Sequence, residues 1–206
     1  NNRIESSLIG TDWTGTYAIA NREDGVYLQD GSNNTIGGGA PGAGNLISGN
    51  SWSGVSLAGT GSGNRVQGNY IGTDGTGNVA IGNAQAGVYL SITGPTMVGG
   101  TAADESNRIA YNGWDGVAIM SGAGHSVLGN EIHSNVEQAI DILDDGITPN
   151  DAGDGDAGPN DRQNYPVLFG AAINGPNVTI SGALNGNAGN YLIEFYANAT
   201  PAPGAE

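Results

Sequence analysis

The chain has 206 residues, of which 38 are Gly, and its formal net charge is −15 with five basic residues and no Cys. This charge disfavours nucleic acids and anionic membrane surfaces as partners, since both are bound through basic patches. The lack of Cys excludes disulfides and thiolate metal sites, and no apolar run approaches the roughly 20 residues of a membrane-spanning helix.

A 62-residue unit occurs twice in the first part of the chain. When 1–62 is placed on 63–124 without a gap, 24 of the 62 pairs are identical, and IGTD at 9–12 falls on IGTD at 71–74. Self-similarity at a fixed period is the signature of a repeat architecture, in which each unit packs against its neighbours. The repeat is therefore the main guide to the fold.

Inside the unit, short segments alternate apolar with polar residues and end at Gly or Asn. One set begins with Gly-Val at Gly25, Gly54, Gly87 and Gly116. A second set comprises 34–36, 45–47, 64–66, 96–98, 107–109 and 126–128. Period-2 spacing between turn residues predicts short strands with one buried face, and the spacing of an amphipathic helix is not sustained anywhere.

Three such strands in about thirty residues predict one coil of a parallel β-helix, with coils stacked about 4.8 Å apart. Stacking would create three apolar columns of mostly β-branched side chains. The predicted columns are Ile4, Ile36, Val66, Val98 and Val127; Val26, Val55, Val88 and Val117; and Ile47, Ile71 and Ile109. We expect an all-β chain whose residues 1–145 form a right-handed parallel β-helix with three strands per coil and about five coils.

Polar corner residues allow two interpretations. Asn2, Asn34 and Asn64 occupy equivalent corners, where their side chains could form one hydrogen-bonded ladder along the stack. Alternatively, Asn is present because it tolerates the left-handed backbone of a tight turn. His125 and His133 lack the partner spacing of a zinc site or a catalytic triad, so we expect both at exposed corners.

Candidate catalytic residues belong mainly to the repeat. Arg3, Arg65 and Arg108 recur in similar contexts, which favours a structural role over that of a lyase base. Asp12 and Asp74 would lie two coils apart, nearly 10 Å, a separation that suits the carboxylate pair of a glycoside hydrolase. A duplicated element is nevertheless a poor source of a catalytic pair, so the pattern favours a non-catalytic protein.

Residues 146–164 form an Asp- and Gly-rich linker. Oxygen-bearing side chains alternate there with Gly, as in tightly folded calcium loops, although the EF-hand pattern is not matched. The candidate ligands are Asp151, Asp154, Asp156, Asn160 and Asp161. So many carboxylates repel one another without a cation, and two outcomes remain: a calcium-ordered loop, which we favour, or a flexible acidic linker.

The periodicity changes in residues 165–206. Longer strands are predicted at 166–173, 177–184 and 190–198, joined by Gly- and Asn-rich turns. Three strands are fewer than the seven or so of a complete sandwich. We expect a small, incomplete antiparallel module, whose exposed strand edges could be completed by another subunit in a head-to-tail filament.

The segments NRVQGNYIGTDGTG, GVYLQDGSNNTIGG and GNLISGN resemble the right-handed parallel β-helix repeats of large bacterial secreted and cell-surface proteins. The C-terminal strands resemble the beginning of an immunoglobulin-like module. These resemblances imply an extracellular or cell-surface location in a bacterium or archaeon, and a stalk, adhesin segment or filament subunit that contacts copies of itself or neighbouring repeats.

Two alternatives to a structural module stay open. One is a carbohydrate-active enzyme, a polysaccharide lyase or glycoside hydrolase, acting on the wall of the helix. The other is a glycan-binding module that uses aromatic side chains, for which Trp52, Trp114 and Tyr111 are the candidates because the repeat stacks the two Trp residues on one corner.

Overall fold

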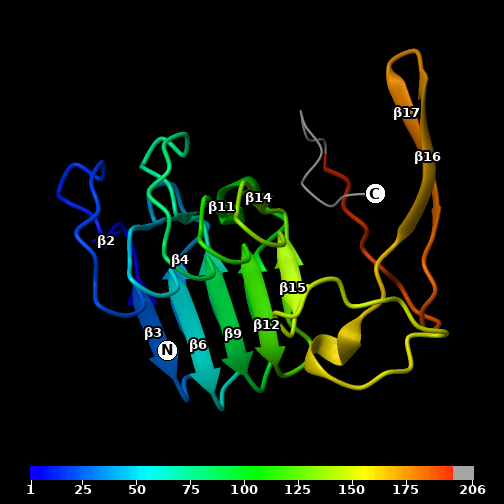
Figure 1. Ribbon diagram of the computed structural model, residues 1–206, viewed down its shortest axis with the longest axis horizontal. Helices are drawn as coiled ribbons and strands as arrows, with labels where there is room; N and C mark the ends of the chain where they lie inside the picture. Colours follow the sequence, from blue (N-terminus) through cyan, green and yellow to red (C-terminus); the bar gives the residue numbers. More distant parts are fainter. Residues whose placement is uncertain (197–206) are drawn as a thin grey trace.

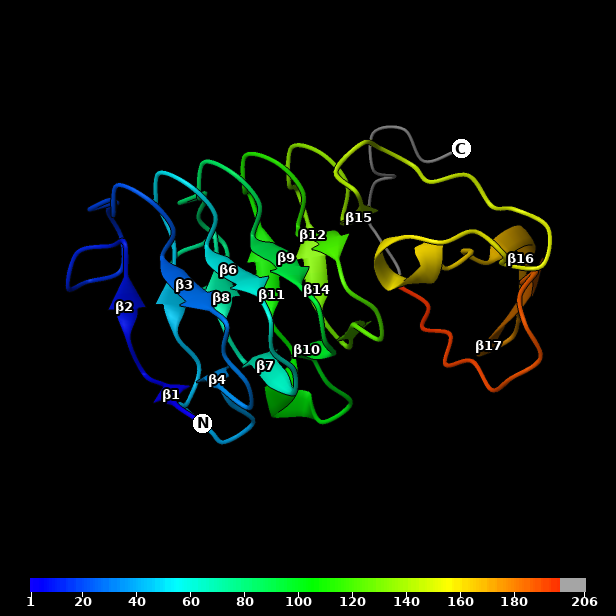
Figure 2. The same cartoon turned by 90° about the horizontal axis from the view of Figure 1, so that it is seen from below.

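Gly and Asn occur every few residues along the chain, and the turns that they form keep the strands short. Successive groups of three strands stack as coils. The computed structural model describes residues 1–196 and contains three parallel sheets of five strands each around a shared apolar interior (Figure 1). Viewed at right angles, successive coils lie side by side along one axis (Figure 2). The chain is a parallel β-helix, as the repeat predicts, followed by a small antiparallel sheet, as the change of periodicity after residue 164 predicts.

Each coil contributes one strand to each of the three sheets. Sheet 1 contains β1 (Arg3–Ile4), β4 (Thr35–Gly37), β7 (Asn64–Gln67), β10 (Thr96–Gly99) and β13 (Ser126–Leu128). Sheet 2 contains β2 (Leu8–Ile9), β5 (Leu46–Ile47), β8 (Tyr70–Ile71), β11 (Arg108–Ala110) and β14 (Glu131–His133). Sheet 3 contains β3 (Val26–Gln29), β6 (Val55–Gly59), β9 (Val88–Ile92), β12 (Val117–Ser121) and β15 (Ile140–Ile142).

The predicted apolar columns are confirmed by the strand register. Ile36 pairs with Ile4 on one side and with Val66 on the other, and the column continues to Val98 and Val127. Most of these side chains belong to one buried cluster inside the helix. Parallel sheets need cover on their buried face, and here each sheet is covered by the other two.

Asn side chains connect the coils at all three corners. Along each ladder, the amide nitrogen of one Asn donates to the side-chain oxygen of the next over 2.8–3.1 Å. Ladder 1 begins with Asn2, Asn34 and Asn64; ladder 2 is Asn45, Asn69, Asn107 and Asn130; ladder 3 is Asn21, Asn50, Asn83, Asn112 and Asn135. The ladder interpretation is confirmed for Asn2, Asn34 and Asn64, and two further ladders accompany it.

His125 is buried, so the expectation that it lies exposed at a corner is wrong. It occupies a rung of ladder 1, where its Nδ1 accepts the backbone N–H of Thr96 over 3.2 Å. Its Nε2 lies 2.9 Å from the carbonyl oxygen of Ser121, which assigns the proton to Nε2. Burial lowers the pKa of His125, so the ring is neutral. His133 is partly exposed.

The IGTD motif opens an arm on every second coil. Residues 11–18 and 73–80 form two equivalent projections, closed by antiparallel bridges between Thr11 and Ala18 and between Thr73 and Ala80. The Gly of the motif is required by close packing: at Gly72, with φ of 88°, a Cβ would lie 2.1 Å from the carbonyl oxygen of Ala110. The motif therefore marks the same corner two coils apart, as expected.

After β15 the chain folds back against the last coil. The short helix η2 (Pro159–Arg162) contacts β12 and β15, and the backbone N–H of Asn160 donates to the carbonyl of Gly122 over 2.6 Å. Near the end of the described chain, the Glu194 carboxylate accepts the N–H of Gly129 over 2.8 Å. These contacts cover part of the C-terminal end of the β-helix.

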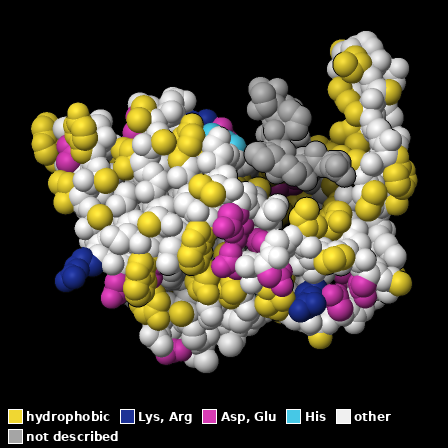
Figure 3. Space-filling model, in the orientation of Figure 1, with side chains coloured by type: hydrophobic (Ala, Val, Ile, Leu, Met, Phe, Trp, Pro, Cys, Tyr) yellow, Lys and Arg dark blue, Asp and Glu magenta, His cyan; other side chains and the backbone are white. Residues whose placement is uncertain are grey.

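The C-terminal module has fewer strands than expected. β16 (Val167–Asn174) and β17 (Asn177–Ala183) form an antiparallel hairpin that stands away from the β-helix (Figure 1). No strand forms at 190–196, so the third predicted strand is wrong there, and its last residues, 197–198, lie outside the described part of the chain. Two strands alone leave both edges open, and many apolar side chains of this hairpin are exposed (Figure 3).

Candidate functional site

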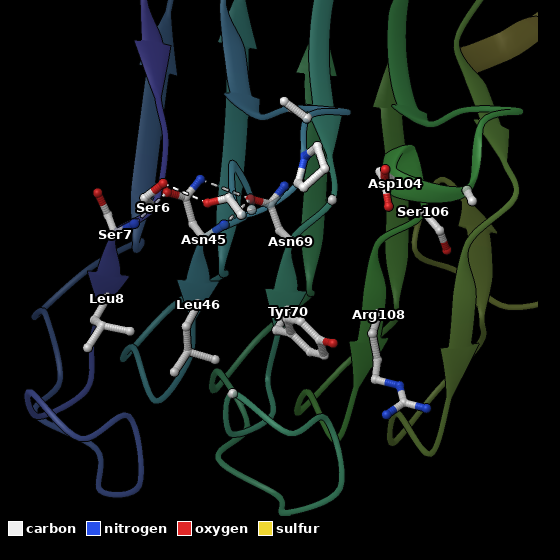
Figure 4. A pocket seen from close by; sticks show the side chains of 18 of the residues that line it. Ser6, Ser7, Leu8, Asn45, Leu46, Asn69, Tyr70, Asp104, Ser106 and Arg108 are labelled. Carbon is white, nitrogen blue, oxygen red and sulfur yellow. Dashed lines mark hydrogen bonds between the residues drawn. The ribbon is translucent and has the colours of Figure 1, made fainter.

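A shallow groove of about 710 Å³ runs across the outer face of sheet 2. Its floor is one outward-facing column, in which Leu8, Leu46, Tyr70 and Arg108 lie on successive coils (Figure 4). The loops around 38–44 and 103–106 contribute further lining residues. The groove therefore crosses several coils and suits an extended ligand better than a compact one.

Arg108 closes one end of this column through a bidentate ion pair. Its Nε and Nη2 donate to the two carboxylate oxygens of Glu131 over 2.7 and 2.6 Å. The hydrogen bond and charge of Arg108 lower the pKa of Glu131, and Glu131 raises the pKa of Arg108. Both groups stay ionised at neutral pH, so this pair neither supplies nor accepts protons there. Apart from Glu131, Asp104 is the one acidic side chain in the described lining.

Asp12 and Asp74 each hold one of the two arms. Two backbone N–H groups donate to each carboxylate, from Thr16 and Tyr17 in the first arm and from Asn78 and Val79 in the second. Hydrogen bonds lower the pKa of Asp12 to about 2, and the largest contribution comes from the Thr14 hydroxyl. At Asp74, burial raises the pKa, but the hydrogen bonds to its carboxylate lower the pKa by more, so the pKa is lowered overall. Both carboxylates therefore act as structural acceptors.

The aromatic candidates Trp52 and Trp114 lie outside the groove. Backbone hydrogen bonds order one corner as Glu23, Trp52, Gln85, Trp114 and Glu137, which places the two Trp residues two coils apart, as the repeat predicts. Trp52 is 45% exposed, whereas Trp114 is half-buried. The ring of Tyr111 packs edge-on against His133 with centroids 5.8 Å apart. Their role in glycan binding stays a prediction.

Tyr70 is the aromatic residue that lines the groove, and sequence reasoning missed it. The signal was present, because Ile71 was assigned to an inward column and its neighbour Tyr70 must then face outward on a two-residue strand. The repeat also places Tyr70 at the position of Leu8.

The predicted calcium ligands have mostly local protein partners. Asp151 accepts the N–H of Gly155, and Asp154 accepts the N–H of Asn164 over 2.6 Å. Asp156 lies 3.8 Å from the guanidinium of Arg162, and Asp161 is exposed. Asn160 accepts the N–H of His125 over 2.8 Å and so extends ladder 1. Calcium binding by these five residues stays a prediction.

A different set of acidic residues does converge. Asp115, Glu137 and Asp144 each place one carboxylate oxygen within 4.8 Å of the other two, and within residues 1–196 this is the one such group of three. Sequence reasoning missed it because its members come from three separate turns. Burial raises the pKa of Asp115 to about 7, with further contributions from Asp144 and Asp141.

Comparisons of the chain with protein-family models, with curated proteins and with solved structures found no match. Within the described residues, no helix has the length and apolar character needed to cross a membrane.

Proposed function

We propose that the chain is a non-catalytic structural module, a rigid spacer within an extracellular assembly. The observation that carries this proposal is ladder 2, which continues unbroken from Asn45 through Asn69 and Asn107 to Asn130 while the apolar columns run beside it. Coils tied by both backbone and side-chain hydrogen bonds leave no natural hinge between them. The extracellular setting rests on the resemblance of the repeats to those of bacterial secreted proteins.

Rigidity is measurable by hydrogen exchange on the 206-residue chain. We expect the strand amides of all three inner coils, including those of β7 and β10, to exchange at similarly slow rates, because opening any one coil breaks contacts with two others. The exposed hairpin of β16 and β17, which stands away from the β-helix, serves as an internal faster-exchanging reference. Rapid exchange confined to one inner coil would reveal a hinge and argue against a spacer.

The first coil supports end-to-end assembly. β1, β2 and β3 are edge strands of their sheets, and Ile4, Ile9 and Leu28 are only partly buried. Unpaired strand edges over an open apolar interior can accept the strands of another coil. The coil that completes this end would come from neighbouring repeats of a longer chain or from another copy.

Sedimentation velocity tests the assembly part of the proposal. We expect the chain to associate as its concentration rises, and Ile4→Arg to abolish association by placing a charge at the open end. Tyr27→Arg adds the same charge to the exposed outer face of the first coil and should leave association unchanged. If the unchanged chain, Ile4→Arg and Tyr27→Arg associate equally, the open end is not the contact between copies.

Glycan binding is the second candidate, and the groove across sheet 2 favours it. Leu8 and Tyr70 are partly exposed on its floor, and an aromatic ring beside polar groups is suited to a sugar ring. Glycan-array binding that is lost in Tyr70→Ala and kept in Trp52→Ala would assign the groove. Loss in Trp52→Ala or Trp114→Ala alone would instead assign the Trp corner. Product formation from a bound glycan would favour the enzyme alternative.

A further inference from the structure

The cluster of Asp115, Glu137 and Asp144 lies where the β-helix ends. Asp115 precedes β12, Glu137 precedes β15, and Asp144 follows β15, so the three residues join the last two coils to the segment that leaves them. Leu143 and Asp144 both have positive φ, 83° and 55°, which turns the chain sharply after the last strand. A group of acidic side chains is visible over this part of sheet 3 (Figure 3).

Asp115 is fully buried, with 0% of its surface exposed. One of its oxygens accepts the backbone N–H of Gln138 over 2.8 Å, and that bond resembles the one from Ser53 to Asp24 three coils earlier. The second oxygen, Oδ2, is buried and has no donor among the described residues. A structural acceptor role therefore explains one oxygen of Asp115 and leaves the other unexplained.

Asp141, beside the cluster, also has a buried carboxylate oxygen without a donor. It is 3% exposed; its Oδ2 accepts the N–H of Gly146 over 2.8 Å, and its buried Oδ1 has no donor in the described structure. None of the ion pairs formed within residues 1–196 includes Asp115, Glu137, Asp141 or Asp144. Buried carboxylates normally have a partner, because the loss of hydration otherwise opposes their burial.

We propose that Asp115, Glu137 and Asp144 bind a divalent cation of the calcium type, with Asp141 beside it. The donors are all carboxylate oxygens, which hard cations prefer, and the set contains no imidazole or thiolate. Separations of at most 4.8 Å are compatible with one shared ion, because two ligands of an ion whose bonds are about 2.4 Å long lie no more than about 4.8 Å apart. Water and second carboxylate oxygens would complete the coordination. This inference does not depend on the proposed structural function.

Such an ion would fasten the end of the β-helix. It would link the turn before β12, the turn before β15 and the reversal at Leu143 and Asp144, where the apolar columns end and no further coil follows within the described chain. The site differs from the Asp- and Gly-rich loop at Asp151–Asp161, where Asp151 and Asp154 accept local backbone N–H groups and Asp156 lies near Arg162 with its Oδ1 buried and without a donor in the described structure. The two locations are separable by mutation.

Calorimetric titration of the chelated 206-residue protein with CaCl2 at pH 7.5 tests the proposal. We expect one ion per chain with a dissociation constant of about 10⁻⁴ M, the range of extracellular calcium modules. Asp144→Asn and Glu137→Gln should each weaken binding roughly tenfold or more. Asp145→Asn, an exposed neighbour outside the cluster, and the double variant Asp154→Asn/Asp156→Asn should bind like the unchanged protein.

Thermal unfolding provides a readout that does not depend on heats of binding. The melting temperature should rise with CaCl2, fall again with EDTA, and respond less in Asp144→Asn. The Asp144 side chain is only half-buried, and Asn tolerates its positive φ of 55°, so we expect this variant to fold. Asp115→Asn keeps the acceptor for Gln138 and removes the buried charge, so it should melt higher than the unchanged protein in EDTA and lose the calcium response. A protein that binds no calcium, or loses binding only in Asp154→Asn/Asp156→Asn, overturns the proposal.

Discussion

The side-chain oxygen of Asn160 accepts the backbone N–H of His125 over 2.8 Å, across 35 residues of sequence. The same type of bond joins Asn34 to Asn64 and Asn2 to Asn34 in ladder 1. The Asp-rich segment therefore adds a rung to the corner along which ladder 1 runs, although Asn160 belongs to no coil. The side-chain bonds of this corner are interrupted at Thr96, whose buried hydroxyl has no partner among the described residues. Asn160, which the composition of its segment suggested as a metal ligand, thus has a structural partner.

Asn160→Ala should destabilise the chain by about 1–3 kcal/mol, because the buried N–H of His125 loses its acceptor and Ala is less suited than Asn to the positive φ of 49° at this position. Urea unfolding at pH 7 measures this change. Asp161→Asn is the matched control: the neighbouring residue is exposed, and Asn tolerates its positive φ of 55°. If Asp161→Asn proves as damaging as Asn160→Ala, the segment is held by something other than this rung.

His125→Asn should restore an amide to ladder 1 and leave stability at pH 7 within about 1 kcal/mol of the unchanged protein. Burial lowers the pKa of His125 in the folded chain, whereas the unfolded chain keeps the ordinary pKa of His. At pH values between these two pKa values the unfolded chain binds more protons than the folded chain. The free energy of unfolding therefore falls as the pH drops through this range. His125→Asn has no titrating ring at this position, so its stability should not fall in this way.

Urea unfolding between pH 5 and pH 7.5 compares the two proteins. His125→Ala leaves the N–H of Thr96 without its acceptor and should be less stable than His125→Asn at every pH. Identical pH dependence in the unchanged protein and His125→Asn would show that protonation of this ring does not control stability.

Asn69→Ala should cost more than about 2 kcal/mol, because several buried groups lose partners together. The Asn69 side chain accepts from the backbone and side chain of Asn45 and donates to Asn107 and to the carbonyl of Ile36. Asn2→Ala removes an exposed terminal rung and should cost about 0.5 kcal/mol or less. Equal losses in the two variants would contradict the importance of burial in these ladders.

Asp74→Ala should destabilise the chain by about 1–3 kcal/mol at pH 7, since the amides of Asn78 and Val79 lose a charged acceptor. The pKa of Asp74 is lowered in the folded state, so its contribution is present above its ordinary value of 3.8 and is lost as pH falls through the folded pKa. The difference between the two proteins should therefore shrink by pH 2.

Unfolding curves at pH 7 and pH 2 measure this convergence. Asp12→Ala removes the equivalent carboxylate from the less buried first arm and should cost less. A constant difference at both pH values would mean that the Asp74 charge contributes nothing to holding the arm.

The fold could be predicted from sequence because its information is local and repeated. IGTD recurs at a fixed offset, and alternating residues such as Ile36 and Val66 specify which side of each strand is buried. A one-residue slip would expose the whole apolar set, so the columns could be predicted from spacing alone. The third C-terminal strand was wrong at 190–196 because strand propensity does not ensure that a partner strand is within reach.

The sites depend on contacts that spacing does not specify. The groove needs the outward column of Leu46 and Tyr70 together with loops that differ between repeats. The acidic cluster needs Asp144 to turn back onto Asp115, across 29 residues, through a backbone reversal that breaks the repeat. By itself, the sequence determined the coil and its three walls, because the order of apolar and polar residues specifies which side chains are buried. Only the tertiary structure decided that His125 and Asn160 are rungs and that three carboxylates meet, because both follow from how the chain closes at the point where its period ends.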